Sequence, residues 1–228
     1  VGAGVYQTGD AIDVSGTTDV YYQVVDQPVF DKEMRVITNP HLVPDVWLVG
    51  GPTTTTGGTV TWFLENWNLI ESSKEETLKK LEAEAEKISP GARGLLFYPC
   101  FVGHRVPHWE PEARGVMIGL TPHHRSNEMY RSIIEGGAFL LREVTETVGQ
   151  LLGTAKEFRM IGGGSASRLV KQIRADITGK TLIEMKEKEA TSLGSAILAA
   201  VGAGVYQDVS AAVQQMTEVR SQTEPDRS

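Results

Sequence analysis

Three adjacent glycines at positions 162–164 stand between an apolar run and a segment with helical periodicity. Glycine loses more conformational freedom on folding than any other residue, so an ordered triple glycine is costly. A strand, a glycine turn and the start of a helix together present backbone N–H groups that can bind a phosphate or another ligand. The stretch therefore predicts either a ligand site or a tight strand-to-helix turn in which Ser165 caps the helix.

The same stretch partly matches a dinucleotide-binding fingerprint. Gly162, Gly164 and Ser167 stand where that motif has glycines, and Glu184 follows about 20 residues later, where an acidic side chain would contact a ribose. However, serine replaces the third glycine, and the motif lies late in the chain instead of in an opening strand–helix–strand unit. A Rossmann-type NAD-binding domain of an oxidoreductase is therefore one alternative.

A second polar turn carries groups suited to phosphate. Gly16, Thr17 and Thr18 lie between two predicted strands, where backbone N–H groups and hydroxyls can donate hydrogen bonds to phosphate oxygens. The same residue types are also usual in hairpin turns that bind nothing. Taken alone, this turn does not decide between a phosphate site and a structural hairpin.

The histidines and the single cysteine predict no metal site. His104, His108, His123 and His124 are close in sequence, but their spacing fits no zinc motif, and we expect them on the surface of a loop or helix. Cys100 stands alone, which excludes an intrachain disulfide and a cysteine-based zinc site and favours a reducing, cytoplasmic location.

Alternating strands and helices must position these residues. The apolar patterns predict two strands within 11–25, further strands at 46–50, 94–99, 157–162 and 181–185, and helices at 53–67, 73–88, from 126 onward, at 165–177, 189–204 and 208–219. Because no linker divides the chain, this alternation indicates one α/β domain over residues 1–220. Residues 221–228 are predicted to be a frayed tail.

Other glycines have structural explanations. Gly136 and Gly137 lie inside a predicted helix, where glycine is unfavourable, and this predicts close packing of another element against them. The heptapeptide VGAGVYQ occurs at 1–7 and again at 201–207, and we expect each copy to end a helix with a glycine cap.

The composition limits the partners. The 228-residue chain is 40% hydrophobic and 22% charged, which is ordinary for a globular protein, and its net charge is −7. Lysine and arginine are scattered, which argues against a nucleic-acid partner. No apolar run approaches the roughly 18 residues of a membrane span, so no membrane partner is expected.

Several longer motifs stand in a recognisable order. They are AIDVSGTTDVYY (11–22), GHRVPHWEPEARGVMIGLT (103–121), SIIEGGAFLLRE (132–143), GGGSASRLVKQIRADITGKTL (162–182) and EATSLGSAILAAVGAG (189–204). In type and order these motifs resemble the FGGY family of carbohydrate kinases, which includes xylulokinase, ribulokinase, gluconokinase and glycerol kinase. The resemblance covers residues 1–220, and Glu110 stands where the family usually has aspartate.

The resemblance implies a fold and a ligand. It implies a ribonuclease-H-like α/β domain of the actin and sugar-kinase type, with a mixed sheet and helices on both faces. The ligand would be ATP or ADP, with Mg²⁺ held mainly through the phosphates. Gly16, Thr17 and Thr18 would then contact the phosphates, while Gly163 and Ser167 would lie against the adenine and ribose.

One further segment belongs to this expected site. Gly51 matches a family position near the nucleotide, and Thr55, in the run of threonines that follows, is assigned to the same site. The alternative for Gly51 is a strand-to-helix turn with no ligand.

The resemblance also implies that the chain carries no catalytic residue. The family's catalytic aspartate lies upstream of the hairpin by more residues than precede Thr17, and Asp10 and Asp13 do not have its spacing. The family's N-terminal domain holds most of the sugar or polyol substrate. The chain is therefore predicted to be the ATP-binding half of a carbohydrate kinase and to be inactive alone. A non-catalytic nucleotide-binding or interaction module is a further alternative, and the sequence leaves open the sugar and whether the protein forms a homodimer.

Overall fold

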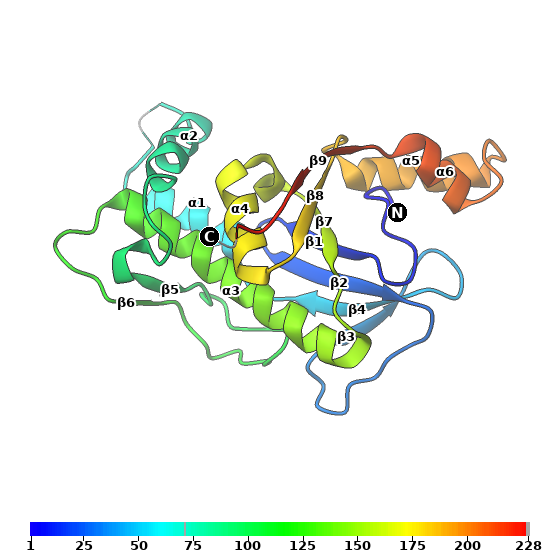
Figure 1. Ribbon diagram of the computed structural model, residues 1–228, viewed down its shortest axis with the longest axis horizontal. Helices are drawn as coiled ribbons and strands as arrows, with labels where there is room; N and C mark the ends of the chain where they lie inside the picture. Colours follow the sequence, from blue (N-terminus) through cyan, green and yellow to red (C-terminus); the bar gives the residue numbers. More distant parts are fainter. Residues whose placement is uncertain (71, 227–228) are drawn as a thin grey trace.

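A mixed sheet of seven strands forms the centre of the computed structural model, which describes residues 1–70 and 72–226 (Figure 1). In their order across the sheet, the strands are β3 (Ile37–Pro40), β4 (Trp47–Pro52), β2 (Asp19–Val25), β1 (Ala11–Ser15), β7 (Glu157–Ile161), β8 (Thr181–Met185) and β9 (Val219–Thr223). β1, β7 and β8 run parallel, and antiparallel pairs lie on both sides of them. A separate antiparallel pair consists of β5 (Leu96–Tyr98) and β6 (Val116–Ile118).

Helices cover both faces of the large sheet. They are α1 (Thr56–Asn66), α2 (Lys74–Ala85), α3 (Ser126–Leu152), α4 (Arg168–Thr178), α5 (Ala190–Gly202) and α6 (Val209–Met216). α3 and α4 pack on one face with α1 and α2 beside them, whereas the start of α5 and the first residues of the chain pack on the other (Figure 1). This arrangement confirms the predicted α/β fold with helices on both faces.

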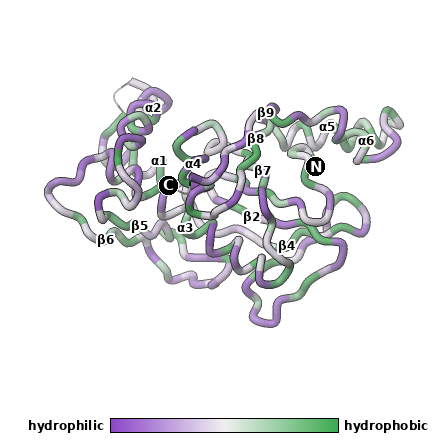
Figure 2. The backbone as a smooth tube through the Cα atoms, viewed as in Figure 1, coloured by the Kyte–Doolittle hydropathy of each residue, from purple (hydrophilic) through white to green (hydrophobic). Residues whose placement is uncertain are grey.

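The alternation of side chains along the strands supplies a core on each face. In β8, Leu182 belongs to the cluster under α3 and α4, whereas its neighbour Ile183 belongs to the cluster that includes Ala190 at the start of α5. Polar segments, purple in Figure 2, lie mainly in α2 and in the loops around the sheet. The sheet thus lies between two cores, and the predicted turns follow its strands β1 and β7.

The expected close packing at Gly136 and Gly137 is confirmed. A Cβ at Gly136 would lie 2.1 Å from the carbonyl oxygen of Phe97, and one at Gly137 would lie 2.4 Å from Cγ2 of Thr56. These two glycines let α3 approach β5 on one side and the start of α1 on the other. α3 thereby packs closely against both the small sheet and α1.

The prediction of a frayed tail from residue 221 is wrong for its first residues. Residues 221–223 belong to β9, which pairs antiparallel with β8, and the Ser221 hydroxyl donates to Glu184 at 2.8 Å. The edge of the sheet supplies hydrogen bonds that the polar sequence of this segment does not reveal. Residues 227 and 228 of the predicted tail lie outside the described residues.

Besides β9, two short strands were not predicted from the sequence. β3 and β6 are only four and three residues long, so no alternating pattern could identify them. Within the described residues, no helix combines the length and the apolar character needed to cross a membrane.

Candidate nucleotide site

A cavity of about 410 Å³ lies between the two turns that the sequence singles out, the hairpin turn (residues 15–18) and the glycine turn (residues 162–167). The two turns follow β1 and β7, which are parallel neighbours, so both lie at the carboxyl ends of these strands. In sheets of this kind, ligands bind outside the carboxyl ends of the strands. Helices supply the rest of the lining with Thr56, Gly57, Val60, Thr61, Lys74, Leu78, Glu82, Tyr130, Ile134, Val170 and Arg174.

The cavity brings together part of the predicted set of nucleotide contacts. It is lined by Gly16, Thr17, Gly163 and Ser167, whereas Thr18, Gly51 and Thr55 are not in its lining.

Gly51 lies elsewhere because β4 carries it into the packing between the sheet and the loop at 100–115. A Cβ at Gly51 would lie 2.6 Å from Cγ2 of Val106, and the Val106 N–H donates to the Pro52 carbonyl at 3.0 Å. The glycine is thus required by that contact. The structure does not bring Gly51 to the cavity as the sequence analysis expected.

The residues of α1 that do line the cavity lie just beyond Thr55. The Thr55 carbonyl accepts the Thr59 N–H at 2.8 Å, which starts the helix, and Gly57 and Thr61 then line the cavity. A Cβ at Gly57 would lie 2.2 Å from the carbonyl oxygen of Gly16, so glycine lets α1 touch the hairpin turn. Gly57 was not among the predicted site residues, although the adjacent glycines 57 and 58 inside a helical pattern were a usable signal.

The three glycines of the glycine turn have different surroundings. Gly162 has a φ of +88°, and a Cβ there would lie 2.5 Å from the carbonyl oxygen of Ser15. A Cβ at Gly164 would lie 2.1 Å from Oγ of Ser15. At Gly163, no atom of the described chain lies within 4 Å of the Cβ position. Packing therefore explains the first and third glycines, but not the second.

Ser167, and not Ser165, caps the helix that follows. The Ser167 hydroxyl accepts the Val170 N–H at 3.2 Å at the start of α4, whereas the Ser165 hydroxyl donates to the Gly162 carbonyl at 2.7 Å. The expectation that Ser165 is the cap is wrong because residues 163–166 form a short 3₁₀ turn before α4 begins. Ser167 thus combines a cap with a place in the cavity lining.

A buried group of three charges ties the two turns together. Arg174 of α4 forms ion pairs with Asp13 of β1 and, at 2.7 Å, with Asp19 of β2. All three side chains are at most 2% exposed. Because Asp13 and Asp19 flank the hairpin turn and Arg174 belongs to the helix after the glycine turn, this buried triad sets the distance between the turns.

Two carboxylates share one guanidinium in this triad. Burial raises the pKa of Asp13 to about 6, and the neighbouring Asp19 carboxylate acts in the same direction, against the attraction of Arg174. Burial opposes the charge of Arg174, but the two carboxylates outweigh it and raise the pKa of the guanidinium. The second oxygen of each carboxylate has no hydrogen-bond partner among the described residues. A proton on Asp13 would balance the charge of the triad.

A second cavity, of about 310 Å³, lies on the other side of the glycine turn. Gly163 lines both cavities, and Glu184 and Glu189 line this one. Burial opposes the charge of Glu184, but hydrogen bonds from Lys171 and Ser221 hold the pKa of its carboxyl below the usual value. Glu184 is therefore paired with side chains of the protein and is not available to bind a ribose.

The expectation that the histidines lie on the surface is wrong for two of them. His104 is 2% exposed and His124 is 7% exposed. Burial lowers the pKa of His104, whose Nδ1 lies 2.7 Å from the Tyr98 hydroxyl. His108, on the same loop, is half exposed and lies 2.6 Å from Glu143 of α3. The hydrogen-bonded loop brings these histidines together in a way that their spacing does not reveal.

The mixed sheet with helices on both faces has the architecture of a ribonuclease-H-like α/β domain of the actin and sugar-kinase type, as does the sugar-kinase structure described below. The family model for the FGGY family of carbohydrate kinases, C-terminal domain, matches residues 11–203. The chain therefore belongs to the FGGY family of carbohydrate kinases. Membership of this family, together with the antiparallel strands in the sheet, overturns the Rossmann-type oxidoreductase alternative.

Relatives and solved structures agree with this assignment. A xylulose kinase from Staphylococcus epidermidis is 31% identical over 225 residues, and a glycerol kinase from Geobacter sp. is 36% identical over 172 residues. These matches cover 99% and 75% of this chain, but 44% and 34% of the relatives. A gluconate kinase structure from Lactobacillus acidophilus matches 99% of this chain and 44% of its own, with 29% identity and a TM-score of 0.83. The chain thus spans less than half the length of the curated relatives it matches.

Proposed function

We propose that this chain is the ATP-binding half of a carbohydrate kinase that transfers the γ-phosphate to a sugar or polyol hydroxyl. The observation that carries the proposal is the open face of Gly163, whose missing side chain is not explained by packing within the described chain. A flat group such as adenine would use this space. The nucleotide-binding domain extends over residues 1–220.

The proposed roles follow the cavity. The backbone of the hairpin turn and the Thr17 hydroxyl bind phosphate oxygens, and Mg²⁺ is held mainly through the phosphates. Gly163 and Ser167 contact the adenine and ribose, and Gly57 and Thr61 complete that side. The catalytic aspartate and most of the sugar pocket belong to the rest of the protein, which acts in the cytoplasm.

Nucleotide binding is tested by calorimetry with Mg-ADP on the chain and on Gly163→Val. Gly163 does not have a left-handed φ, so valine fits the backbone, but its methyl groups enter the space assigned to adenine. We expect ADP binding to be lost while the circular dichroism spectrum is retained. Gly202→Val is the matched control, because Gly202 also lies in open space without a left-handed φ but is outside both cavities. Unchanged ADP affinity in folded Gly163→Val would make the glycine turn purely structural.

The proposal that the chain binds ATP but needs the rest of the kinase for turnover is tested by ADP release with a panel of pentoses, hexoses and polyols. We expect no sugar-dependent turnover from the chain alone, and turnover when the remaining half of the kinase is added in trans. Loss of a general base typically slows a reaction by about 10²–10⁴-fold. Loss of substrate positioning raises the activation free energy further, by up to roughly 7–11 kcal/mol. Turnover by the chain alone would contradict the proposal. Mg-ADP binding without turnover in the complete protein would favour the non-catalytic module.

A further inference from the structure

Two histidines and a carboxylate converge away from the nucleotide cavity. The ligating atoms of His104, His108 and Glu143 lie within 4.8 Å of one another. Nε2 of His108 lies 2.6 Å from Oε1 of Glu143, and Nε2 of His104 lies 3.8 Å from Oε2 of the same carboxylate. This is a donor set that divalent zinc prefers, because imidazole nitrogens and carboxylate oxygens are its usual ligands.

His104 is the fixed member of this group. Its ring is buried, and its Nε2 has no hydrogen-bond partner among the described residues. Its backbone N–H and carbonyl are both bonded to Glu110, at 2.9 and 2.8 Å, and the next residue, Arg105, donates to the Thr53 carbonyl at the end of β4. The backbone therefore holds in place a buried imidazole nitrogen that forms no hydrogen bond with any described residue.

His108 and Glu143 are the adjustable members. The His108 N–H donates to the Arg105 carbonyl at 2.8 Å, and this turn brings the His108 ring to a centroid distance of 4.8 Å from the His104 ring. The side chains of His108 and Glu143 are 50% and 38% exposed. A tetrahedral site with bonds of about 2.0–2.1 Å separates its ligand atoms by about 3.3 Å. Small rotations of these two exposed side chains would reach that spacing.

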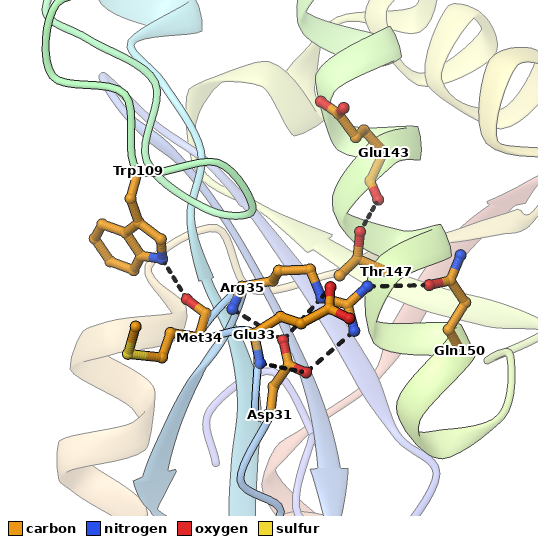
Figure 3. A network of polar contacts seen from close by, with 8 residues as sticks. All are labelled: Asp31, Glu33, Met34, Arg35, Trp109, Glu143, Thr147 and Gln150. Atoms are coloured by element: carbon orange, nitrogen blue, oxygen red, sulfur yellow. Dashed lines mark hydrogen bonds and ion pairs between the residues drawn. The ribbon is translucent and has the colours of Figure 1, made fainter.

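The surroundings leave the Glu143 carboxylate free for this role. Figure 3 shows it pointing away from Arg35, which is bonded to Asp31 and Gln150 instead. On the other side, the Tyr98 hydroxyl lies 2.7 Å from Nδ1 of His104. With Nε2 on a metal, Nδ1 would carry the proton and donate it to the Tyr98 oxygen. An outer hydrogen bond of this kind fixes the tautomer of a metal-binding histidine.

We propose that His104, His108 and Glu143 bind one divalent zinc-type metal ion, with water as the fourth ligand. The ion would link the loop at 100–115 to α3. Because the same loop is hydrogen-bonded to Pro52 and Thr53 at the end of β4, this link would also restrain the segment that leads into α1. Magnesium, which prefers oxygen ligands in octahedral geometry, is not expected in this site.

The test is titration of the chain with Zn²⁺ and separately with Mg²⁺, followed by calorimetry and by thermal unfolding. We expect one Zn²⁺ per chain, no Mg²⁺ binding at this site, and a higher unfolding temperature with Zn²⁺. His108→Ala and Glu143→Gln should each lower Zn²⁺ affinity by more than about 100-fold, and Tyr98→Phe by about 10–100-fold, the usual loss for an outer partner.

His123→Ala is the matched control, because His123 is exposed and outside the group. Its Zn²⁺ affinity should equal that of the unchanged chain. A Co²⁺-loaded sample should show the visible absorption of four-coordinate cobalt, and His108→Ala should lose it. The proposal is overturned if His108→Ala and Glu143→Gln bind Zn²⁺ as the unchanged chain does, or if His123→Ala loses as much affinity as they do.

Discussion

The hairpin turn and the glycine turn both lie at the carboxyl ends of parallel strands, yet they contact the rest of the chain differently. In the hairpin turn, the carbonyl oxygen of Gly16 lies only 2.2 Å from the Cβ position of Gly57 in α1, and the Gly58 N–H donates to the Thr17 carbonyl at 3.0 Å. At Gly163, the glycine turn meets no atom of the described chain within 4 Å of the Cβ position. One turn is therefore fixed by the protein, while the other combines fixed positions with one open position.

Packed and open glycine positions lie next to each other in the glycine turn. Gly162 and Gly164 pack against Ser15 and carry the glycine turn up to the hairpin turn. The buried triad then holds the strands and the helix behind both turns. Removing side chains at packed positions lets backbones approach each other, whereas removing one at an open position leaves space. Substitutions at each kind of position should therefore affect either stability or nucleotide binding.

The largest expected effect is on the link between the turns. Arg174→Met leaves Asp13 and Asp19 buried without a cation, and breaking a buried ion pair from one side typically costs about 3–5 kcal/mol. We expect a loss of that size in the free energy of unfolding, measured with urea. The control is Arg168→Met in the same helix, because the Arg168 side chain is 90% exposed. Equal stability of the two variants would show that the triad does not join the turns.

The second effect is a dependence on pH. Burial raises the pKa of Asp13 to about 6, above the ordinary value of 3.8, so the folded state binds a proton more tightly than the unfolded chain does. Its stabilising contribution is therefore fully present below about pH 4 and is lost as the pH rises through 6. At about 1.36 kcal/mol per pKa unit, the change is on the order of 2–3 kcal/mol.

Asp13→Asn isolates this effect because asparagine cannot ionise. Carboxyls outside the triad titrate in both proteins, so their contributions cancel when the two are compared. We expect the free energy of unfolding of Asp13→Asn, relative to the unchanged chain, to rise by about 2–3 kcal/mol between pH 4 and pH 7. A difference that is constant over this range would contradict the raised pKa.

The two turns could be predicted from the sequence, but the triad could not. Turn chemistry is local: the run from Ser15 to Thr18 and the three glycines announce turns by residue type alone. Arg174 and Asp13 are 161 residues apart, and no short motif pairs them. The alternation in β1 would place Ile12 and Val14 inward, but the structure buries Asp13 on the same face as Ala11 instead. An inward-facing charge requires a buried partner, but the pattern does not say which.

The repeated heptapeptide shows the same limit. In the first copy, Ala3 and Val5 are buried against the sheet, whereas in the second copy Val205 is 69% exposed after the end of α5. The expectation that both copies end a helix is wrong for the first, because no described helix precedes it. Packing partners from distant parts of the chain decide the environment of an identical local sequence. The burial of His104 was unpredictable for the same reason.

The third effect distinguishes adjacent glycines. Gly162→Ala would force an L-residue to a φ of +88° and a ψ of −175°, a backbone region used essentially by glycine, at about 1–3 kcal/mol, and would also place a Cβ 2.5 Å from the Ser15 carbonyl oxygen. Gly163→Ala meets no such contact. We expect a loss of at least about 1–3 kcal/mol in the free energy of unfolding for Gly162→Ala, and no measurable loss for Gly163→Ala. Similar losses in both variants would mean that the two positions do not differ as described.

The smallest expected effect concerns Ser167, which both caps α4 and lines the cavity. Its hydroxyl caps α4, so Ser167→Ala should lower the free energy of unfolding by about 1 kcal/mol. Asp208→Ala is the matched control, because Asp208 caps α6 by accepting the Ala211 N–H at 2.8 Å and lies outside both cavities. If the Ser167 hydroxyl also contacts the nucleotide, Ser167→Ala should weaken Mg-ADP binding by the roughly 0.5–1.5 kcal/mol of one hydrogen bond. Calorimetry should find no such change in Asp208→Ala. Ser167→Thr should restore both properties, because threonine keeps the hydroxyl, whereas equal ADP affinity in Ser167→Ala and Asp208→Ala would leave Ser167 with the cap alone.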